Sequence, residues 1–228
     1  MTYNSWPIGQ LPEDFKRPEL DIVMKEYGLT NPMDVVDKFE NTIAEYAGSR
    51  YAVAVDSCTN ALFLSLKYFC YAERIATLIP NYTYISVPQT ILNAGYSVIF
   101  EDLGWFGYYQ IKPLPIYDMA VRFTKGMYIG GLCCLSFQIK KRLPIGKGGM
   151  ILLNDYTAYQ WLKKARYEGR DITKPYEEDQ IEFTGWNMYM TPEDAARGLL
   201  LFEKLPEHND DICNWSHYTD LSKQKVFQ

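Results

Sequence analysis

The segment YAVAVDSCTNALFLSLKYF, residues 51–69, decides the fold that we expect for this chain. Its first five residues are apolar and form a run of the length of a short buried strand. Asp56, Ser57 and Thr59 follow as a polar turn, after which apolar residues return at helical spacing. The segment therefore predicts a strand, a polar turn and a helix, the repeating unit of an α/β protein.

The same unit recurs along the first two thirds of the chain. Further strands are expected at residues 75–80, 96–102, 114–118, 127–137 and 150–153, and further helices at residues 32–47 and 81–95. Residues 103–112 are aromatic and irregular; Trp105, Phe106 and Tyr108 there could line a pocket or cover the sheet. Repeated strand–helix units predict an α/β fold, with a mostly parallel sheet covered by helices.

The pattern changes after Asn154. Two helices are expected beyond it, TAYQWLKKARYEG from Thr157 and TPEDAARGLLLFEKL from Thr191, with a loop between them. We therefore expect residues 1–154 to form an α/β domain and residues 155–228 a helical C-terminal part.

Composition excludes several classes of protein. The 228 residues are 47% apolar and 22% charged, and the net charge is −5 without a basic stripe, so a nucleic-acid partner is not expected. No apolar window is long enough to span a bilayer, and the first residues lack the features of a secretion signal. Five cysteines without metal-ligand spacing to His208 or His217 predict reduced thiols and no metal site. We expect a cytoplasmic protein with no membrane partner.

Polar side chains gather where the expected strands end. Ser57, Thr59, Tyr84, Asp118 and Ser136 lie at or just past such ends, and ligands of open α/β sheets bind at that edge. Each residue also has a simpler interpretation. The serine and threonine of the first turn are typical helix N-caps, the tyrosine is typical of a core, and the aspartate is typical of a hydrogen-bonded turn.

A lysine pair precedes a glycine-rich turn in SFQIKKRLPIGKGG, residues 136–149. The glycines stand at the entry of a strand, where the backbone must turn tightly or approach a ligand. A lysine held there could carry a cofactor, although Lys140 and Lys141 alone are also typical of a solvated basic turn. The turn does not match a nucleotide-binding G-x-x-x-x-G-K-[ST] loop, because Gly148 follows Lys147.

Six motifs, taken in order, resemble the DegT/DnrJ/EryC1/StrS family of pyridoxal phosphate (PLP)-dependent aminotransferases, whose best-known members aminate nucleotide-linked keto sugars. They are FENTIAEYAG from Phe39, AVDSCTNAL from Ala54, PNYTY from Pro80, IYDMA from Ile116, SFQIKKRLPIGKGG from Ser136 and GWNMYMTPEDAA from Gly185. The resemblance implies a PLP-transferase large domain of fold type I over residues 1–154. It also implies that residues 155–228 are the remnant of the family's small domain.

The resemblance implies a catalytic role for two residues. Counting from Ser136 places the family's lysine at Lys141, which would hold the cofactor as a Schiff base and carry protons. Asp118 would keep the ring nitrogen of the cofactor protonated, because a nearby carboxylate favours a charged ring. Tyr84 would stack on the ring.

The resemblance also implies how the cofactor phosphate is bound. Cys58, Thr59 and Asn60 form the helix N-terminus that would hold it, joined by the Ser136 hydroxyl. In the family, the G-x-N loop reaches the neighbouring subunit, so Asn187 would act across the interface of a homodimer.

Two features depart from the family pattern. Val121 stands where the family commonly has Gln or His, so Arg122 or another group would have to contact the phenolic oxygen of the cofactor. In addition, only about sixteen positions separate Asp102 from Asp118, where the family has a longer passage, and little chain follows residue 205. We therefore expect an unusually short family member with an open substrate site.

The expected function is transfer of an amino group from a donor such as glutamate, alanine or ornithine to a carbonyl acceptor. The acceptor would be either a nucleotide-linked keto sugar or a small oxo acid. The alternative is a degenerate relative that serves as a non-catalytic binding or assembly module. Retention of both Lys141 and Asp118 favours the enzyme.

Overall fold

A computed structural model describes residues 17–69, 75–211 and 215–228. Residues 1–16, on which part of the secretion argument depends, and Cys70 and Cys213 lie outside the described residues. The strands are β1 (Tyr51–Val55), β2 (Ala76–Pro80), β3 (Ser97–Glu101), β4 (Tyr109–Gln110), β5 (Ile116–Asp118), β6 (Leu132–Ser136) and β7 (Gly149–Leu153). Five of them form a sheet in the order β1-β7-β6-β5-β4, and β2 pairs with β3.

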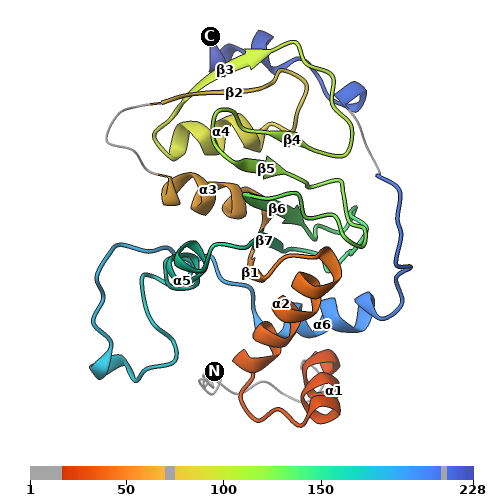
Figure 1. Ribbon diagram of the computed structural model, residues 1–228, viewed down its shortest axis with the longest axis vertical. Helices are drawn as coiled ribbons and strands as arrows, with labels where there is room; N and C mark the ends of the chain where they lie inside the picture. Colours follow the sequence, from red (N-terminus) through yellow and green to blue (C-terminus); the bar gives the residue numbers. More distant parts are fainter. Residues whose placement is uncertain (1–16, 70–74, 212–214) are drawn as a thin grey trace, which may run out of the picture.

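The two sheets meet edge to edge (Figure 1). Leu78 of β2 forms an antiparallel bridge with Lys112, two residues past the end of β4. The pairings make β1, β2, β3, β5 and β6 run in one direction and β4 and β7 in the other. A mostly parallel sheet was expected, but only β5–β6 and β2–β3 pair parallel, whereas β1–β7, β6–β7 and β4–β5 pair antiparallel. The connections from β4 to β5 and from β6 to β7 contain no crossover helix, which a parallel pairing would require.

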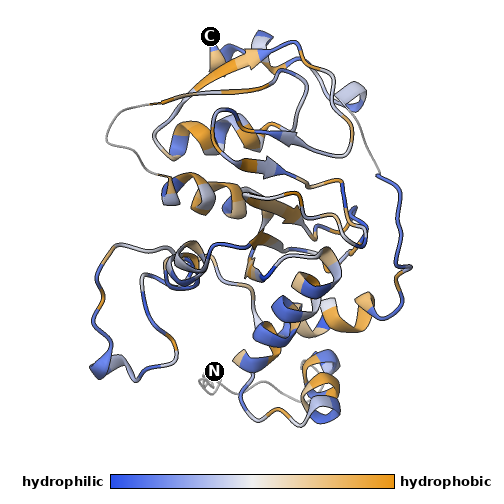
Figure 2. Ribbon diagram, in the orientation of Figure 1, coloured by the Kyte–Doolittle hydropathy of each residue, from blue (hydrophilic) through white to orange (hydrophobic). Residues whose placement is uncertain are grey.

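Helices cover both faces of the sheet (Figure 1). They are α1 (Pro18–Tyr27), α2 (Met33–Ala47), α3 (Cys58–Tyr68), α4 (Ser86–Asn93), α5 (Tyr156–Ala165) and α6 (Pro192–Phe202). The residues of β7 alternate between two cores: Met150 and Leu152 pack with α2 and α6, whereas Ile151 and Leu153 pack with α3, α4 and α5. The strands β1, β6 and β7 are almost entirely apolar because both of their faces are buried. Figure 2 shows β6 and β7 as mainly hydrophobic. The α/β class is therefore confirmed.

Some element bounds differ from the predictions. The helix expected at residues 81–95 begins only at Ser86, and the strand expected at 127–137 begins at Leu132. Gly130 and Gly131 have φ values of 107° and 62°, in the left-handed region, which prevents an extended strand before that point. Helix α1 was not predicted, and β4 lies in the segment that we expected to be irregular.

A buried ion pair ties the C-terminal part of the chain to the α/β part. Arg166, the C-cap of α5, is 2% exposed and donates to Glu40 of α2 and to the carbonyl of Ala54 in β1. Glu40 also accepts from the Ala54 amide at 2.7 Å and from Lys163 at 2.8 Å. Helix α5 packs on α3 and β1, and α6 on α2. The domain division at residue 154 stays a prediction.

The last described segment lies over β2 and β3 (Figure 1). It contains the short 3-10 helices η3 (Trp215–His217), η4 (Leu221–Lys223) and η5 (Lys225–Phe227); a further one, η2 (Tyr176–Glu178), lies between α5 and α6. Asp220 bridges to Tyr82, and the ring of Phe227 contacts that of Phe100. The C-terminal segment therefore packs on the α/β part of the molecule.

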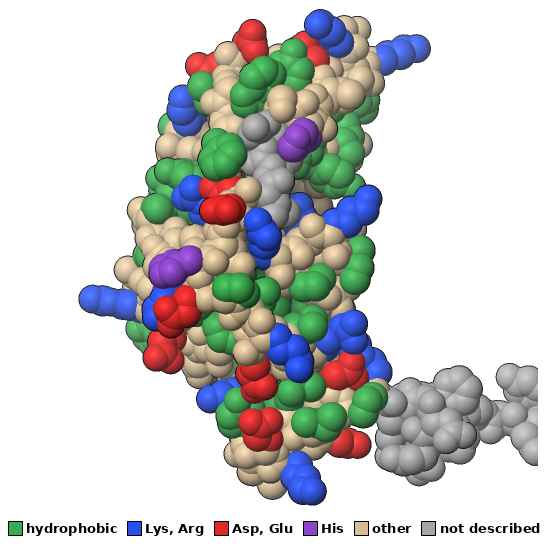
Figure 3. Space-filling model, turned by 90° about the vertical axis from the view of Figure 1, so that its right-hand side faces the viewer, with side chains coloured by type: hydrophobic (Ala, Val, Ile, Leu, Met, Phe, Trp, Pro, Cys, Tyr) green, Lys and Arg blue, Asp and Glu red, His purple; other side chains and the backbone are tan. Residues whose placement is uncertain are grey.

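The surface in Figure 3 shows basic and acidic side chains interspersed on one face. Within residues 17–69, 75–211 and 215–228, none of the helices has both the length and the apolar character needed to cross a membrane. Cys58, Cys133 and Cys134, the cysteines of the described part, are free thiols.

Candidate active site

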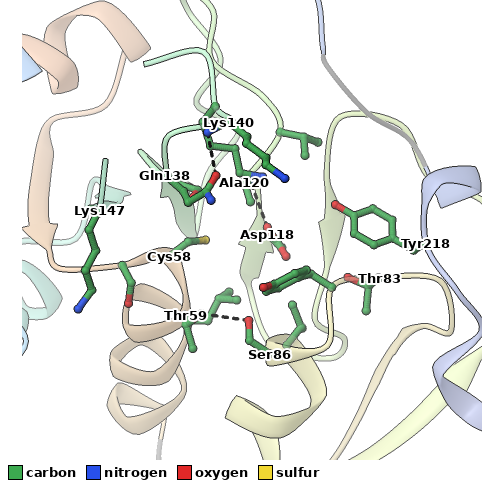
Figure 4. Close-up of a pocket in the computed structure, with 18 of the residues that line it drawn as sticks. Cys58, Thr59, Thr83, Ser86, Asp118, Ala120, Gln138, Lys140, Lys147 and Tyr218 are labelled. Atoms are coloured by element: carbon green, nitrogen blue, oxygen red, sulfur yellow. Dashed lines mark hydrogen bonds between the residues drawn. The ribbon is translucent and has the colours of Figure 1, made fainter. Parts of the chain in front are cut away.

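A pocket of about 380 Å³ opens at the carboxyl ends of β5 and β6, beside the start of α3. This volume falls in the roughly 300–1,000 Å³ range of small-molecule sites. Figure 4 shows Asp118 at its centre, with Thr59 and Ser86 on one side and Lys140 on the other. Six residues proposed from the sequence line it: Cys58, Thr59, Tyr84, Asp118, Ser136 and Lys141.

Asp118 is the last residue of β5 and is only 7% exposed. Its Oδ2 accepts a hydrogen bond of 2.7 Å from the Tyr109 hydroxyl, and its Oδ1 accepts one of 2.9 Å from the Ala120 amide. Burial raises the pKa of Asp118, while the two hydrogen bonds and the charge of Lys141 act to lower it. The carboxylate is thus held in a dry site by a few specific donors.

Lys141 lies in the loop that connects β6 to β7. Its amide donates to the Gln138 carbonyl at 2.8 Å, which makes a tight turn, and Phe137 and Gly148 close the loop at 2.9 Å. Both lysines of the pair line the pocket, but Lys140 is exposed and Lys141 is partly buried. The charge of Lys141 is one of the influences that lower the pKa of Asp118 against the effect of burial.

The start of α3 presents donors to the pocket. Ser57 is the N-cap, as its residue type predicts, and its Oγ accepts from the Asn60 amide at 3.2 Å. The amides of Cys58 and Thr59 precede the first backbone bond of the helix, which runs from Ala61 to Ser57. Such free amides at a helix N-terminus favour a phosphate.

Hydroxyl groups extend this donor set. Thr59 Oγ1 lies 3.0 Å from Ser86 Oγ, and Ser136 ends β6 at the same pocket. Cys58 adds no charge, because burial, followed by the negative charge of Asp118, raises the pKa of its thiol well above the ordinary value. The group bound there would meet neutral donors beside the lysines that line the pocket, Lys140, Lys141 and Lys147.

Two proposed residues are not brought into the pocket. Asn60 donates from its side chain to Asp56 at 2.6 Å and from its amide to Ser57, so in this structure it supports the helix N-terminus. Asn187 is exposed and donates to Glu168 at 3.0 Å. A role for Asn187 in the site of a second copy of the chain stays a prediction.

The structure also corrects the expectation for Arg122. Val121 lines the pocket, but Arg122 forms an ion pair with Asp211 at 2.8 Å and lies 4.5 Å from the centre of the Tyr108 ring. The guanidinium is therefore committed to another part of the surface and does not replace the missing Gln or His.

Several lining residues were not proposed as site residues from the sequence. They are Ser57, Leu62, Thr83, Ser86, Val87, Trp105, Ala120, Val121, Gln138, Lys140, Lys147, Gly148 and Tyr218. Thr83 stands inside the PNYTY motif, and Ser86 opens α4, so both carried a local signal. Trp105 lines the pocket, whereas Phe106 is 61% exposed and Tyr108 contacts Arg122. Tyr218 comes from the C-terminal segment, and no local pattern predicted its position.

These residues fit pyridoxal phosphate by the chemistry of their donors. A lysine amine, a buried carboxylate, a tyrosine ring and a helix N-terminus with hydroxyl groups line one pocket of sufficient volume. No cluster of ligands suited to a metal ion occurs in the described ranges. Fold and pocket together define a class, the PLP-dependent enzymes of fold type I.

The family model described as "DegT/DnrJ/EryC1/StrS aminotransferase family" matches residues 13–129 and 121–221. The chain belongs to this family of PLP-dependent aminotransferases. The resemblance stated from the six motifs is thereby confirmed, together with the fold and the cofactor of the family.

Named relatives agree with this assignment. The chain is 28% identical over 234 residues to GDP-perosamine synthase of Escherichia coli O157:H7, covering 84% of this chain and 63% of the relative. It is 24% identical over 219 residues to a UDP-4-amino-4,6-dideoxy-N-acetyl-beta-L-altrosamine transaminase of Campylobacter jejuni, covering 76% and 57%. The chain therefore spans less than two thirds of these curated relatives.

The fold is also found in solved structures. AtS13 from Actinomadura melliaura superposes with a TM-score of 0.69 at 22% identity, covering 81% of this chain and 64% of AtS13. At this identity, the likeness supports the fold alone.

Proposed function

We propose that this chain is a PLP-dependent aminotransferase that transfers an amino group from an amino acid to a nucleotide-linked keto sugar. The observation that carries the proposal is the meeting of Lys141, Asp118 and the N-terminus of α3 in one pocket. The printed names of two relatives, which refer to a GDP-linked and a UDP-linked amino sugar, favour the sugar acceptor over a small oxo acid.

Each residue has a distinct task in this proposal. When bound, pyridoxal phosphate supplies an aldehyde that takes up amino groups and a ring that withdraws electrons. The Nζ of Lys141 would hold the aldehyde and would later carry a proton. The Asp118 carboxylate would favour a protonated ring nitrogen, and the ring of Tyr84, which is 60% exposed at the pocket, would stack on the cofactor ring.

The phosphate is assigned to the start of α3. The amides of Cys58 and Thr59, the Thr59 hydroxyl and the Ser136 hydroxyl would bind it. We further propose a homodimer in which Asn187 completes the site of the partner subunit. The exposed position of this residue outside its own pocket is compatible with that arrangement.

The first experiment is absorption spectroscopy of the purified protein mixed with pyridoxal phosphate. A visible band that borohydride abolishes, with a reduced adduct located by mass spectrometry on Lys141, is expected. Lys141→Ala should remove the band, and Lys140→Ala, its matched neighbour, should keep it. A wild-type protein that binds no pyridoxal phosphate at saturation contradicts the proposal.

The second experiment identifies the two substrates. Glutamate, alanine and ornithine are screened as donors by loss of the band, and GDP- or UDP-linked keto sugars and 2-oxo acids are then offered as acceptors. Turnover of a 2-oxo acid but of no sugar nucleotide would replace the sugar assignment. Binding of the cofactor without response to any donor would favour the non-catalytic alternative.

A further inference from the structure

Tyr109 is placed against Asp118 by the strand ladder itself. It belongs to β4 and stands directly opposite Asp118 of β5 in the antiparallel register. Side chains of paired residues project from the same face of a sheet, so the hydroxyl reaches the carboxylate, at 2.7 Å from Oδ2. Tyr109 and Asp118 are 5% and 7% exposed.

Thr83 completes a chain of hydroxyl groups. Its Oγ1 lies 2.5 Å from the Tyr109 hydroxyl, and Thr83 is 3% exposed. An ionised carboxylate only accepts hydrogen bonds, and a tyrosine hydroxyl has one proton to donate. Tyr109 must therefore donate to Asp118, and Thr83 must donate to Tyr109. Consecutive hydrogen bonds of this kind polarise one another and strengthen the last donor.

The ring of Tyr109 is fixed by its neighbours as well as by the ladder. Its ring lies 5.0 Å from that of Trp105, and the two pack in a small cluster with Val121 and Tyr218 at the wall of the pocket. The hydroxyl is thus pre-positioned, because few rotamers are open to a buried ring.

We propose that Tyr109, supported by Thr83, is a positioning residue that keeps the Asp118 carboxylate ionised and aimed into the pocket. This inference rests on the proposed function, in which the carboxylate faces the ring nitrogen of the cofactor. The Ala120 amide fixes Oδ1 at 2.9 Å, and Tyr109 fixes Oδ2, so both oxygens are oriented before any ligand enters.

The other groups that act on Asp118 do not replace Tyr109. Burial raises the pKa of Asp118; among the influences that lower it, the Tyr109 hydrogen bond is the largest, followed by the Ala120 amide and Lys141. Cys58 of α3 and Cys134 of β6 also face it, and burial raises the pKa of both thiols far above neutrality, so they carry no charge. Loss of the Tyr109 hydroxyl would leave a buried oxygen without its donor.

The test titrates the Asp118 carboxyl by carbon-13 NMR in protein free of cofactor, with the resonance assigned by Asp118→Asn. In Tyr109→Phe, the midpoint should move to higher pH, and in Thr83→Val it should move the same way by less. Tyr96→Phe is the matched control, because its buried hydroxyl bonds the Leu66 carbonyl at 2.9 Å, away from the pocket. A role in packing alone would leave the midpoint unchanged in all three variants, and this result would overturn the inference.

A second measurement uses pyridoxal phosphate as the probe. Tyr109→Phe should weaken its binding about tenfold, since a hydrogen bond to a charged group contributes about that factor or more. Tyr96→Phe should bind like the wild type, and equal affinity in both variants would count against the inference. If the wild type binds no pyridoxal phosphate, the proposed function fails, and the NMR titration still decides the role of Tyr109. If Tyr109→Phe does not fold, an unchanged midpoint in Thr83→Val overturns the inference.

Discussion

Gly149 and Ser57 approach so closely that no side chain fits between them. A Cβ atom on Gly149 would lie 2.3 Å from the Ser57 carbonyl carbon and 2.5 Å from the Cys58 amide nitrogen. Gly149 begins β7 and pairs with Val55, the last residue of β1. The loop that carries Lys141 therefore ends against the backbone that begins α3, the turn that we propose binds the phosphate.

Gly149→Ala should disturb this junction. Because the obstructing atoms are backbone, the helix N-terminus must shift, and we expect a loss of stability of about 1–3 kcal/mol together with weaker cofactor binding. Urea denaturation and a pyridoxal phosphate titration measure the two effects. Gly95→Ala is the control: a Cβ there meets no atom within 4 Å, and only its φ of 98° costs energy. Equal cofactor affinity in both variants would contradict the expected shift.

Glu40→Gln should destabilise the fold without touching the pocket. It removes the carboxylate that neutralises Arg166 in the core, and breaking a buried pair costs about 3–5 kcal/mol. Chemical denaturation measures the loss. Glu45→Gln, on the exposed side of the same helix, should change stability by less than about 0.5 kcal/mol. The double variant Glu40→Gln/Arg166→Met should be more stable than Glu40→Gln alone. If it is not, the unpaired charge of Arg166 is not the cause of the lost stability.

Asp118 should make stability depend on pH in the protein free of cofactor. Burial raises the pKa of Asp118 in the folded state. Its contribution to the free energy of unfolding is therefore fully present below the unfolded pKa of about 3.9 and is lost as pH rises through the folded pKa. The stability of Asp118→Asn relative to wild type should therefore increase between pH 4 and pH 7. Denaturation at both pH values measures this change, with exposed Asp102→Asn as the control. A relative stability that falls over this interval would show that the pKa of Asp118 is lowered.

Thr59→Val should weaken binding of the cofactor phosphate. The substitution removes the hydroxyl of Thr59 at the start of α3, which lies 3.0 Å from Ser86 Oγ. Loss of a hydrogen bond to an anion lowers affinity about tenfold or more. Titration with pyridoxal phosphate should show the loss, whereas titration with pyridoxal, which has no phosphate, should not. Thr42→Val, which removes a hydroxyl bonded to the Lys38 carbonyl in α2, is the control. An equal loss of affinity for pyridoxal phosphate and for pyridoxal would show that Thr59 does not contact the phosphate.

Asn187 should act in the partner subunit of the proposed homodimer. Lys141→Ala and Asn187→Ala are each expected to be inactive alone. Mixed dimers of the two variants contain one site with both residues intact and should recover part of the activity. Activity measured after subunit exchange tests this expectation. Activity that stays absent in mixed dimers, with exchange verified by mass spectrometry, would place both residues in one site.

Local patterns in the sequence predicted most of the elements. The apolar run after Arg50 is β1, the helix expected at residues 32–47 is α2, and Ser57 caps α3. These predictions succeeded because capping and periodicity act within a few residues. The strand expected from Met127 was too long, because left-handed glycines break the extended backbone before Leu132.

The candidate site was predicted where motif residues stand at strand ends. Asp118, Ser136 and Lys141 line one pocket because β5 and β6 are parallel neighbours and their carboxyl ends meet at the same edge. Thr83 and Ser86 were missed although Thr83 stands inside the PNYTY motif and Ser86 two residues after it, since a hydroxyl in a turn is more often a local cap than a ligand-binding group.

By itself, the sequence determined the α/β class and the order of its units, because these depend on spacing along the chain, and its motifs carried the family resemblance that points to Lys141. The tertiary structure alone decided that Tyr109 supports Asp118, that Arg166 neutralises Glu40 and that Tyr218 reaches the pocket wall. These contacts join separate segments through strand register and burial. Their energies arise when distant segments exclude water together, and no local pattern in the sequence encodes that step.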